Sequence, residues 1–171
     1  KIPTEKLLIL DKDVRNLNSN YAAVYQDFKN DIGDALQTGL PLLKKYDKLI
    51  LVYPRLISYP NEIVVGFRNF CMAFNQKYSI IQEINPDTAV HPKEAFSVIE
   101  EPDLVNLIKI CRSQKWMVGK DVGIISYNET PLKEILQEGI TVLSTDHTKM
   151  GEDAARLILE NKKEKIKNPF S

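Results

Sequence analysis

The sequence predicts an α/β fold of three layers, in which helices cover both faces of a parallel, Rossmann-like sheet. Short apolar runs of strand length alternate along the chain with longer amphipathic stretches of helix length, an order typical of strands joined by helical crossovers. The runs are apolar at consecutive positions, as expected of strands that are buried on both faces. A chain of 171 residues has room for one domain with one sizeable core.

The first half of the chain predicts three strands and two helices. The strands are predicted for residues 6–10, 21–25 and 49–53. The first helix is predicted for residues 28–46, where apolar side chains recur at the helical period after Asp27, a suitable capping residue. Gly39 and Pro41 are expected to break or kink this helix. The second helix follows the turn at 59–61 and carries its apolar residues on one face.

The second half repeats the alternation. Strands are predicted for residues 95–99, 122–127 and 140–143, and helices are predicted to begin at Glu101, at Thr130 and near Lys149. Glu101, Pro102 and Asp103 have the composition of a helix start, with a capping residue, a proline and an acid. The last helix is expected to end near Glu164, where the lysine cluster of residues 162–167 would complement the helix dipole.

Composition excludes several classes of protein. Lys plus Arg number 23 and Asp plus Glu number 23, so the formal charge is zero, whereas a surface that grips nucleic acid carries a basic excess. The chain alone is therefore not expected to bind DNA. Its longest apolar run is of strand length, and no membrane association is expected. Cys71 and Cys111 lie in apolar stretches without a Cys-x-x-Cys spacing, which indicates buried free thiols and a cytoplasmic location.

The sequence carries no recognisable catalytic motif. Its glycines form neither a dinucleotide-binding nor a phosphate-binding loop, and no serine-hydrolase elbow occurs. No cofactor, metal site or catalytic residue is predicted. The adjacent acids Glu100 and Glu101 leave open an α/β enzyme that uses them as acid and base, although neighbouring side chains point in different directions.

A binding site is predicted from the ends of the strands. In open parallel sheets, ligands bind just beyond the carboxyl ends of the strands. The polar residues at those ends are Asp11, Lys12, Gln26, Asp27, Arg55, Glu100, Glu101, Asn128, Glu129, Thr145, Asp146 and His147. Paired oxygen acceptors beside the rings of Tyr53, Tyr59 and Tyr127 would suit a sugar-sized polyol. Helix capping explains several of these positions, such as Asp27 and Glu101, without any ligand, and both interpretations stay open.

The segment from residue 119 to residue 160 carries the pattern of a known family. A strand ends in Ser-Tyr-Asn-Glu-Thr at 126–130, an amphipathic helix and a short strand at 140–142 follow, and Met150 and Gly151 open the last helix. This order and spacing resemble the effector-binding domains of the lactose-repressor family, which have the type I periplasmic-binding-protein-like fold. Further matches to that family lie upstream, at residues 7–12, Asp27, residues 66–68 and residues 98–103.

The resemblance implies a sensor of a small molecule. Its details are most similar to the sugar-sensing domains attached to gluconate-repressor-type (GntR) winged helices in Bacteroidetes. Such a domain would bind a sugar or sugar derivative and modulate DNA binding by the attached winged helix, in a cytoplasmic homodimer. A periplasmic sugar-binding transport receptor would have the same fold and is an alternative, as is the α/β enzyme that uses Glu100 and Glu101.

The ligand contacts of the family fall on particular residues of this chain. The strand-end Asp corresponds to Asp11, the strand-end Asn to Glu100, the motif carboxylate to Asn128 and the aromatic residue after the crossover to His147. Sugar-binding members commonly have Arg at the position of Ile63, so either Arg55 or another residue takes its place or the ligand differs. The predicted ligand-binding residues are Asp11, Arg55, Tyr59, Glu100, Tyr127, Asn128 and His147.

The resemblance also implies how the chain divides. Residues 20–141 would form the C-terminal lobe of the effector-binding domain, and residues 1–13 and 142–171 would be partial elements of its N-terminal lobe. The DNA-binding domain would lie outside this chain and would make the only contact with DNA. The zero net charge would then describe a sensor whose DNA-binding part is elsewhere.

Overall fold

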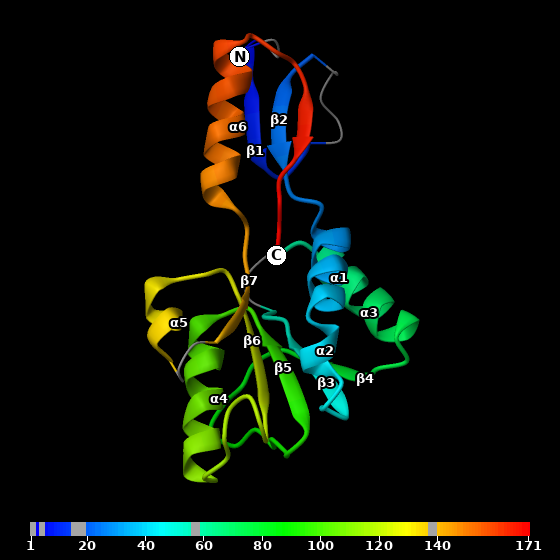
Figure 1. Cartoon of the computed structure of the whole chain (residues 1–171), viewed down its shortest axis with the longest axis vertical. Coiled ribbons are helices and arrows are strands. Elements are labelled where there is room, and N and C mark those ends of the chain that lie inside the picture. Colours follow the sequence, from blue (N-terminus) through cyan, green and yellow to red (C-terminus); the bar gives the residue numbers. More distant parts are fainter. Residues whose placement is uncertain (1–2, 4–5, 15–19, 56–58, 137–139) are drawn as a thin grey trace. The chain divides into compact units, whose positions relative to one another are not determined.

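The chain divides into two compact units, each with a parallel sheet of its own (Figure 1). The computed structural model describes residues 3, 6–14, 20–55, 59–136 and 140–171. The smaller unit comprises Lys1–Asp27 and Thr145–Ser171, and the larger unit is the continuous stretch Phe28–Ser144. No helix in the described ranges is both long enough and apolar enough to cross a membrane.

The smaller unit is a three-stranded sheet with one helix packed against it. The strands β1 (Leu8–Asp11), β2 (Ala22–Tyr25) and β8 (Lys165–Lys167) pair in the order β1-β2-β8. The helix α6 (His147–Leu159) buries Met150, Ala154 and Leu157, which follow the helical period, against Ala22 and Val24 of the central strand. Both ends of the chain therefore contribute to this unit (Figure 1).

The larger unit contains a five-stranded parallel sheet in the order β4-β3-β5-β6-β7. Its strands are β3 (Lys48–Val52), β4 (Lys77–Ile81), β5 (Glu94–Val98), β6 (Gly123–Tyr127) and β7 (Thr141–Leu143). All residues of β5 and β6 are buried, which explains their continuous apolar character. From the adjacent pair β3 and β5, the chain winds outward in both directions. The carboxyl ends of this pair are thus the topological switch point at which open sheets bind ligands.

Helices cover both faces of this sheet. They are α1 (Phe28–Thr38), α2 (Leu40–Leu43), α3 (Glu62–Ala73), α4 (Glu101–Ser113) and α5 (Pro131–Ile135). On one face, Leu104 and Leu107 of α4 pack with Phe96 and Val98 of β5. The pair α1 and α3 lies on the other face (Figure 1). The predicted three-layer α/β architecture is therefore confirmed in the larger unit.

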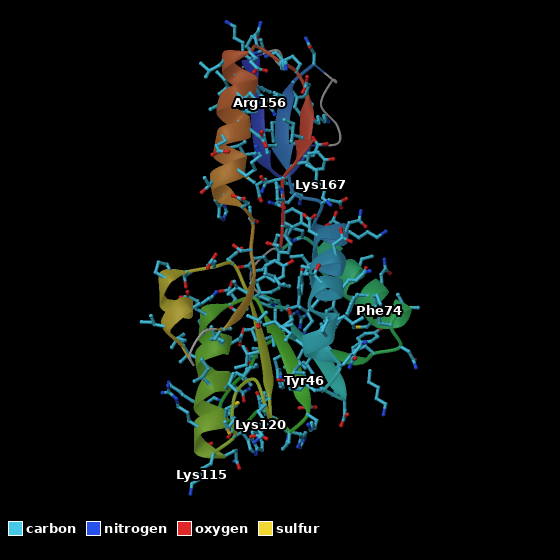
Figure 2. The ribbon with its side chains drawn as sticks, viewed as in Figure 1. Tyr46, Phe74, Lys115, Lys120, Arg156 and Lys167 are labelled. Atoms are coloured by element: carbon cyan, nitrogen blue, oxygen red, sulfur yellow. The ribbon has the colours of Figure 1, made fainter. Side chains whose placement is uncertain are left out.

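Tyr46, labelled in Figure 2, precedes β3 and lies close to the first residue of β6. A Cβ atom added to Gly123, the first residue of β6, would lie 2.7 Å from the Tyr46 ring and 2.8 Å from the Cβ of Ala95. Glycine is therefore required at this position by close packing. The ring of Tyr46 fills the space that a side chain at residue 123 would otherwise occupy.

The strand predicted at 21–25 lies in the smaller unit. Because β2 pairs with β1 and β8, the first boundary between the units falls after Asp27 and not near residue 20. The second boundary falls after Ser144. A short run of alanine and valine predicts a buried strand but carries no information about the sheet that it joins, since strand pairing depends on distant segments.

Other differences concern helix ends and an edge strand. The predicted helix at 28–46 is interrupted at Gly39, as expected, and becomes α1 and α2. The last helix ends at Leu159 and not near Glu164, and Lys165 lies in β8, where it donates to both carboxylate oxygens of Asp13 at 3.1 and 3.0 Å. The cation therefore stabilises a strand and a loop rather than a helix end. The edge strand β4 was missed because its first residues are polar and exposed.

The two cysteines are buried free thiols, as predicted. Burial raises the pKa of Cys71 to about 12 and, against an opposing backbone hydrogen bond, that of Cys111 to about 11. Both side chains are therefore uncharged in neutral solution and act as small apolar residues of the core.

Candidate functional site

Five of the seven predicted ligand-binding residues lie in the larger unit, at or near the carboxyl edge of its sheet. The parallel strands β3, β5 and β6 end at Val52, Val98 and Tyr127, and their registers align these ends along one edge. Arg55, Tyr59, Glu100, Tyr127 and Asn128 follow or terminate these strands. Lys115 and Lys120, labelled in Figure 2, lie at the opposite end, before β6 begins.

Tyr59 and Glu100 form the centre of this edge. The Tyr59 hydroxyl donates a hydrogen bond to Oε1 of Glu100, which joins the segment after β3 to the segment after β5 at the switch point. Tyr53 supports the pair, because its hydroxyl donates to the backbone oxygen of Tyr59 at 2.7 Å. Burial and then the Glu100 carboxylate raise the pKa of Tyr59 to about 12, so the phenol keeps its proton and remains a donor. Sequence reasoning chose both residues, and the structure brings them together.

Asn128 is exposed at this edge, and its backbone lies in the left-handed region, with φ at +59°. The backbone N–H of Asn128 donates to the backbone oxygen of Leu143 at 2.8 Å. The backbone oxygen of Asn128 accepts from the ammonium of Lys133 at 2.7 Å. The same ammonium donates to the oxygen of Tyr127 at 2.8 Å. Lys133 is 3% exposed, and burial lowers its pKa while Glu101 opposes that shift. A buried cation thus fixes the turn that presents the exposed Asn128 side chain.

Lys133 was not identified from the sequence. The signal available was a lysine in a single-turn helix that begins four residues after the end of β6. Such a residue needs a local acceptor, and the carbonyl groups at the end of β6 provide two.

Tyr127 has a different environment from Tyr59. Its side chain is buried, with 6% of the residue exposed, and burial followed by the Asp31 carboxylate of α1 raises its pKa. The ring therefore contributes to the packing of the larger unit. A role of Tyr127 in binding a ligand stays a prediction.

A groove of about 610 Å³ lies beside the Tyr59–Glu100 pair, at the ends of β3 and β4 and along α3. Arg55 and Tyr59 line it, together with Tyr53, Pro54, Asn61, Val64, Arg68, Ile80, Ile81 and Gln82. Sequence reasoning missed Arg68 as a site residue. The available signal was its spacing, because Val64 and Arg68 are one helical turn apart and share a face of α3. Ile63, at the position where the sequence resemblance would place an arginine, is 1% exposed and belongs to the core.

Asp11 and His147 lie in the smaller unit. Asp11 ends β1 with φ at +71°. Its backbone oxygen accepts a hydrogen bond from the backbone N–H of Gln26 at 2.7 Å. His147 is the first residue of α6, after Asp146, whose carboxylate caps the helix by accepting from the Lys149 N–H at 2.7 Å. Both candidate side chains belong to exposed residues. The predicted site residues therefore divide between the two units.

Helix capping does not explain Glu100, and the adjacent carboxylates of Glu100 and Glu101 have different partners. Glu100 occupies the position before α4 with extended backbone, but its side chain makes no capping hydrogen bond and instead accepts from Tyr59. Glu101 is the first helical residue and is exposed. Its negative charge favours the charged form of Lys133 and opposes the lowering of the Lys133 pKa by burial. The two carboxylates therefore face different partners, and the prediction that Glu101 caps this helix is wrong by one residue.

Asp103 connects α4 to the loop after β4. Its carboxylate accepts from the N–H of Ile84 at 2.6 Å. Burial raises the pKa of this carboxyl against the opposing hydrogen bond from Ile84, and the carboxylates of Glu83 and Glu100 also raise it. A carboxyl with a raised pKa favours folding in its protonated form, so its contribution to stability is lost as the pH rises through the folded-state pKa.

We expect Asp103→Asn to remove this pH dependence, because the amide oxygen still accepts from Ile84 and carries no charge. The stability of the wild type relative to the variant should fall as the pH rises from about 4 to neutral, since about 4 is the ordinary range of an aspartate. Urea unfolding followed by the fluorescence of Trp116, the single tryptophan, measures this difference. Glu101→Gln, at an exposed neighbour, is the control. A difference that does not vary with pH would contradict the assignment.

The chain is similar to a known domain family and to several solved structures. A family model described as a periplasmic binding protein-like domain matches residues 59–169. The trehalose repressor from Escherichia coli superposes with a TM-score of 0.74 at 16% identity, covering 98% of this chain and 69% of that one. A regulatory protein of the LacI family from Chloroflexus aggregans gives 0.69 at 13% identity, covering 95% and 66%.

A LacI family transcriptional regulator from Lactobacillus casei, solved with bound glucose, gives a TM-score of 0.69 at 13% identity and covers 98% of this chain and 68% of that one. At such identities the likeness establishes the fold alone. The chain spans about two thirds of the length of these structures. No curated protein matches the sequence.

Proposed function

Because the chain belongs to the periplasmic-binding-protein-like domain family, we propose that it senses a small-molecule effector, a sugar or sugar derivative, for a bacterial transcription regulator. The observation that carries the proposal is the Tyr59–Glu100 pair at the switch point of the larger sheet, with Asn128 presented on the same edge. Carboxylate and amide oxygens beside an aromatic ring suit the hydroxyl groups and C–H faces of a sugar. Structural neighbours that are LacI-family regulators, one of them with bound glucose, support the same interpretation.

In this proposal the larger unit is the C-terminal lobe of the sensor, and the smaller unit is part of its N-terminal lobe. Asp11 and His147, which lie in the smaller unit, remain predicted ligand-binding residues. The chain passes between the units at 27–28 and at 144–145. An effector that binds one conformation of the protein more tightly than another would favour that conformation, and this difference in affinity is the free energy available for regulation.

The proposal for the parts of the regulator outside the sensor rests on the sequence resemblance. We infer a cytoplasmic homodimer with a DNA-binding head of the winged-helix type found in gluconate-repressor-type regulators. The solved neighbours are described as LacI-family regulators, which supports the sensor fold and leaves the type of head to the parent sequence. A transport receptor would share the binding step. The two are separated by whether the effector changes the affinity of the parent protein for DNA.

Binding is tested by calorimetric titration of the chain with a panel of monosaccharides and their derivatives. We expect saturable binding of at least one compound, and a loss of about tenfold or more in affinity in both Glu100→Ala and Asn128→Ala, because each removes hydrogen bonds to the ligand. Glu101→Gln, next to Glu100 but directed elsewhere, should bind as the wild type does. Absence of binding by every compound, or equal affinity in all variants, would overturn the proposal.

A further inference from the structure

The groove along α3 carries positive charge at the edge where the effector is proposed to bind. Two charged side chains line it, Arg55 and Arg68, and no carboxylate does so among the described residues. Tyr53, Asn61 and Gln82 add polar groups to the same walls, and Ile80 and Ile81 form an apolar part. The groove is therefore a concave surface with two guanidinium groups and neutral hydrogen-bonding partners.

Local structure explains why two arginines from different segments line the same groove. Arg55 follows Pro54 at the end of β3, the strand next to β4. Arg68 lies in α3, whose Ile63, Phe67 and Phe70 are buried against the sheet, so the arginine falls on the face that these residues leave exposed. Both are exposed, and neither forms an ion pair with a carboxylate in the part of the chain that the structure describes.

The chemistry of the groove matches an oxyanion. A guanidinium group offers planar, paired donors that fit the oxygens of phosphate or carboxylate, and it stays charged at all physiological pH values. Burial raises the pKa of the Tyr53 hydroxyl, and the nearby Glu62 carboxylate raises it further. Glu62 itself does not line the groove. Like charges on one concave surface repel each other, and a bound anion would relieve that repulsion.

We propose that this groove binds an anionic group of the effector, which is therefore a sugar phosphate or a sugar acid and not a neutral sugar. The inference rests on the proposed function and specifies its ligand. Tyr59 connects the two parts of the site, because it lines the groove and also donates to Glu100 on the carboxyl edge. The anionic group lies between Arg55 and Arg68, and the hydroxyl groups of the sugar extend toward Glu100. Ile63, in the core, takes no part.

Four probes test the inference by calorimetry on the whole chain: glucose, glucose 6-phosphate, gluconate and inorganic phosphate. At least one of the two anionic sugars should bind at least about tenfold more tightly than glucose, and its affinity should fall with rising salt because the charges are exposed. Arg55→Gln and Arg68→Gln should each reduce that affinity by about tenfold. Arg112→Gln, an exposed arginine on α4, is the matched control and should change nothing. Thermal unfolding of each variant checks that its fold is intact.

The outcomes separate this inference from the proposed function. Glucose that binds as tightly as both anionic sugars, or anion binding unchanged in both arginine variants, would overturn the inference and leave a neutral-sugar sensor. Inorganic phosphate that binds as tightly as glucose 6-phosphate would also overturn it, because the sugar would then contribute nothing. Failure of all four probes, together with failure of the wider panel, would count against both.

Discussion

Gly66→Ala is expected to lower the free energy of unfolding of the larger unit by about 3 kcal/mol, the upper range for overpacking a dense interior. The helices α1 and α3 cross at this residue, and a Cβ atom there would lie 2.0 Å from the backbone oxygen of Lys29 and 2.6 Å from Cγ2 of Ile32. A backbone oxygen cannot rotate away as a side chain can. The two helices must therefore separate, and the contacts along their shared surface are lost.

Urea unfolding followed by the fluorescence of Trp116 measures this effect, because Trp116 packs against the core of the larger unit. Gly33→Ala is the matched control on α1. Its added Cβ would lie 4.0 Å from the oxygen of Gly66, an ordinary contact, so removing a glycine from the helix interior should instead stabilise by about 0.5–1 kcal/mol. Equal changes in both variants would show that the helices do not approach each other closely at Gly66.

Lys133→Met is expected to destabilise the larger unit by about 2 kcal/mol. The substitution leaves the backbone oxygens of Tyr127 and Asn128 without the ammonium donor, and each unsatisfied buried acceptor costs about 1–3 kcal/mol. Burial disfavours the charged form of Lys133, so removing this buried cation offsets part of the loss of stability. Methionine is similar in length, so lost packing contributes little.

The same unfolding measurement applies, with amide hydrogen exchange at residues 127–130 as a second readout. Exchange there should accelerate in Lys133→Met, because the left-handed backbone of Asn128 loses one of its two restraints. Lys109→Met, on the exposed face of α4, should leave both readouts unchanged. Unaltered stability and exchange in Lys133→Met would mean that the Leu143 oxygen alone fixes the turn.

The central strands of the larger unit could be predicted within a residue at each end. Continuous apolar runs at 49–53, 95–99 and 122–127 correspond to β3, β5 and β6. Such runs are a local signal, because a strand covered on both faces must be apolar at every position. The same rule fails for β4, which is half-exposed at the sheet edge and therefore has polar residues that resemble a loop.

The candidate site could be predicted in outline. The carboxyl-end rule selected Tyr59 and Glu100 separately, and the structure joins them by a hydrogen bond. Arg68 and Lys133 could not be selected in this way, because each lies inside a helix and reaches its site only after that helix packs beside the sheet. Their roles depend on segments that are distant along the chain or on the exact path of a turn.

The sequence by itself determined the buried strands, most of the helices and the polar residues that follow each strand, because periodicity and strand ends are properties of neighbouring residues. It did not determine the edge strands β4 and β8. Only the tertiary structure decided that β2 joins β1 and β8, and that Tyr59 points to Glu100 while Tyr127 is buried near Asp31. Two tyrosines near the ends of parallel strands look alike in sequence. They differ because the burial of each ring depends on the segments that pack around it, and this packing is set by contacts between residues far apart in the chain.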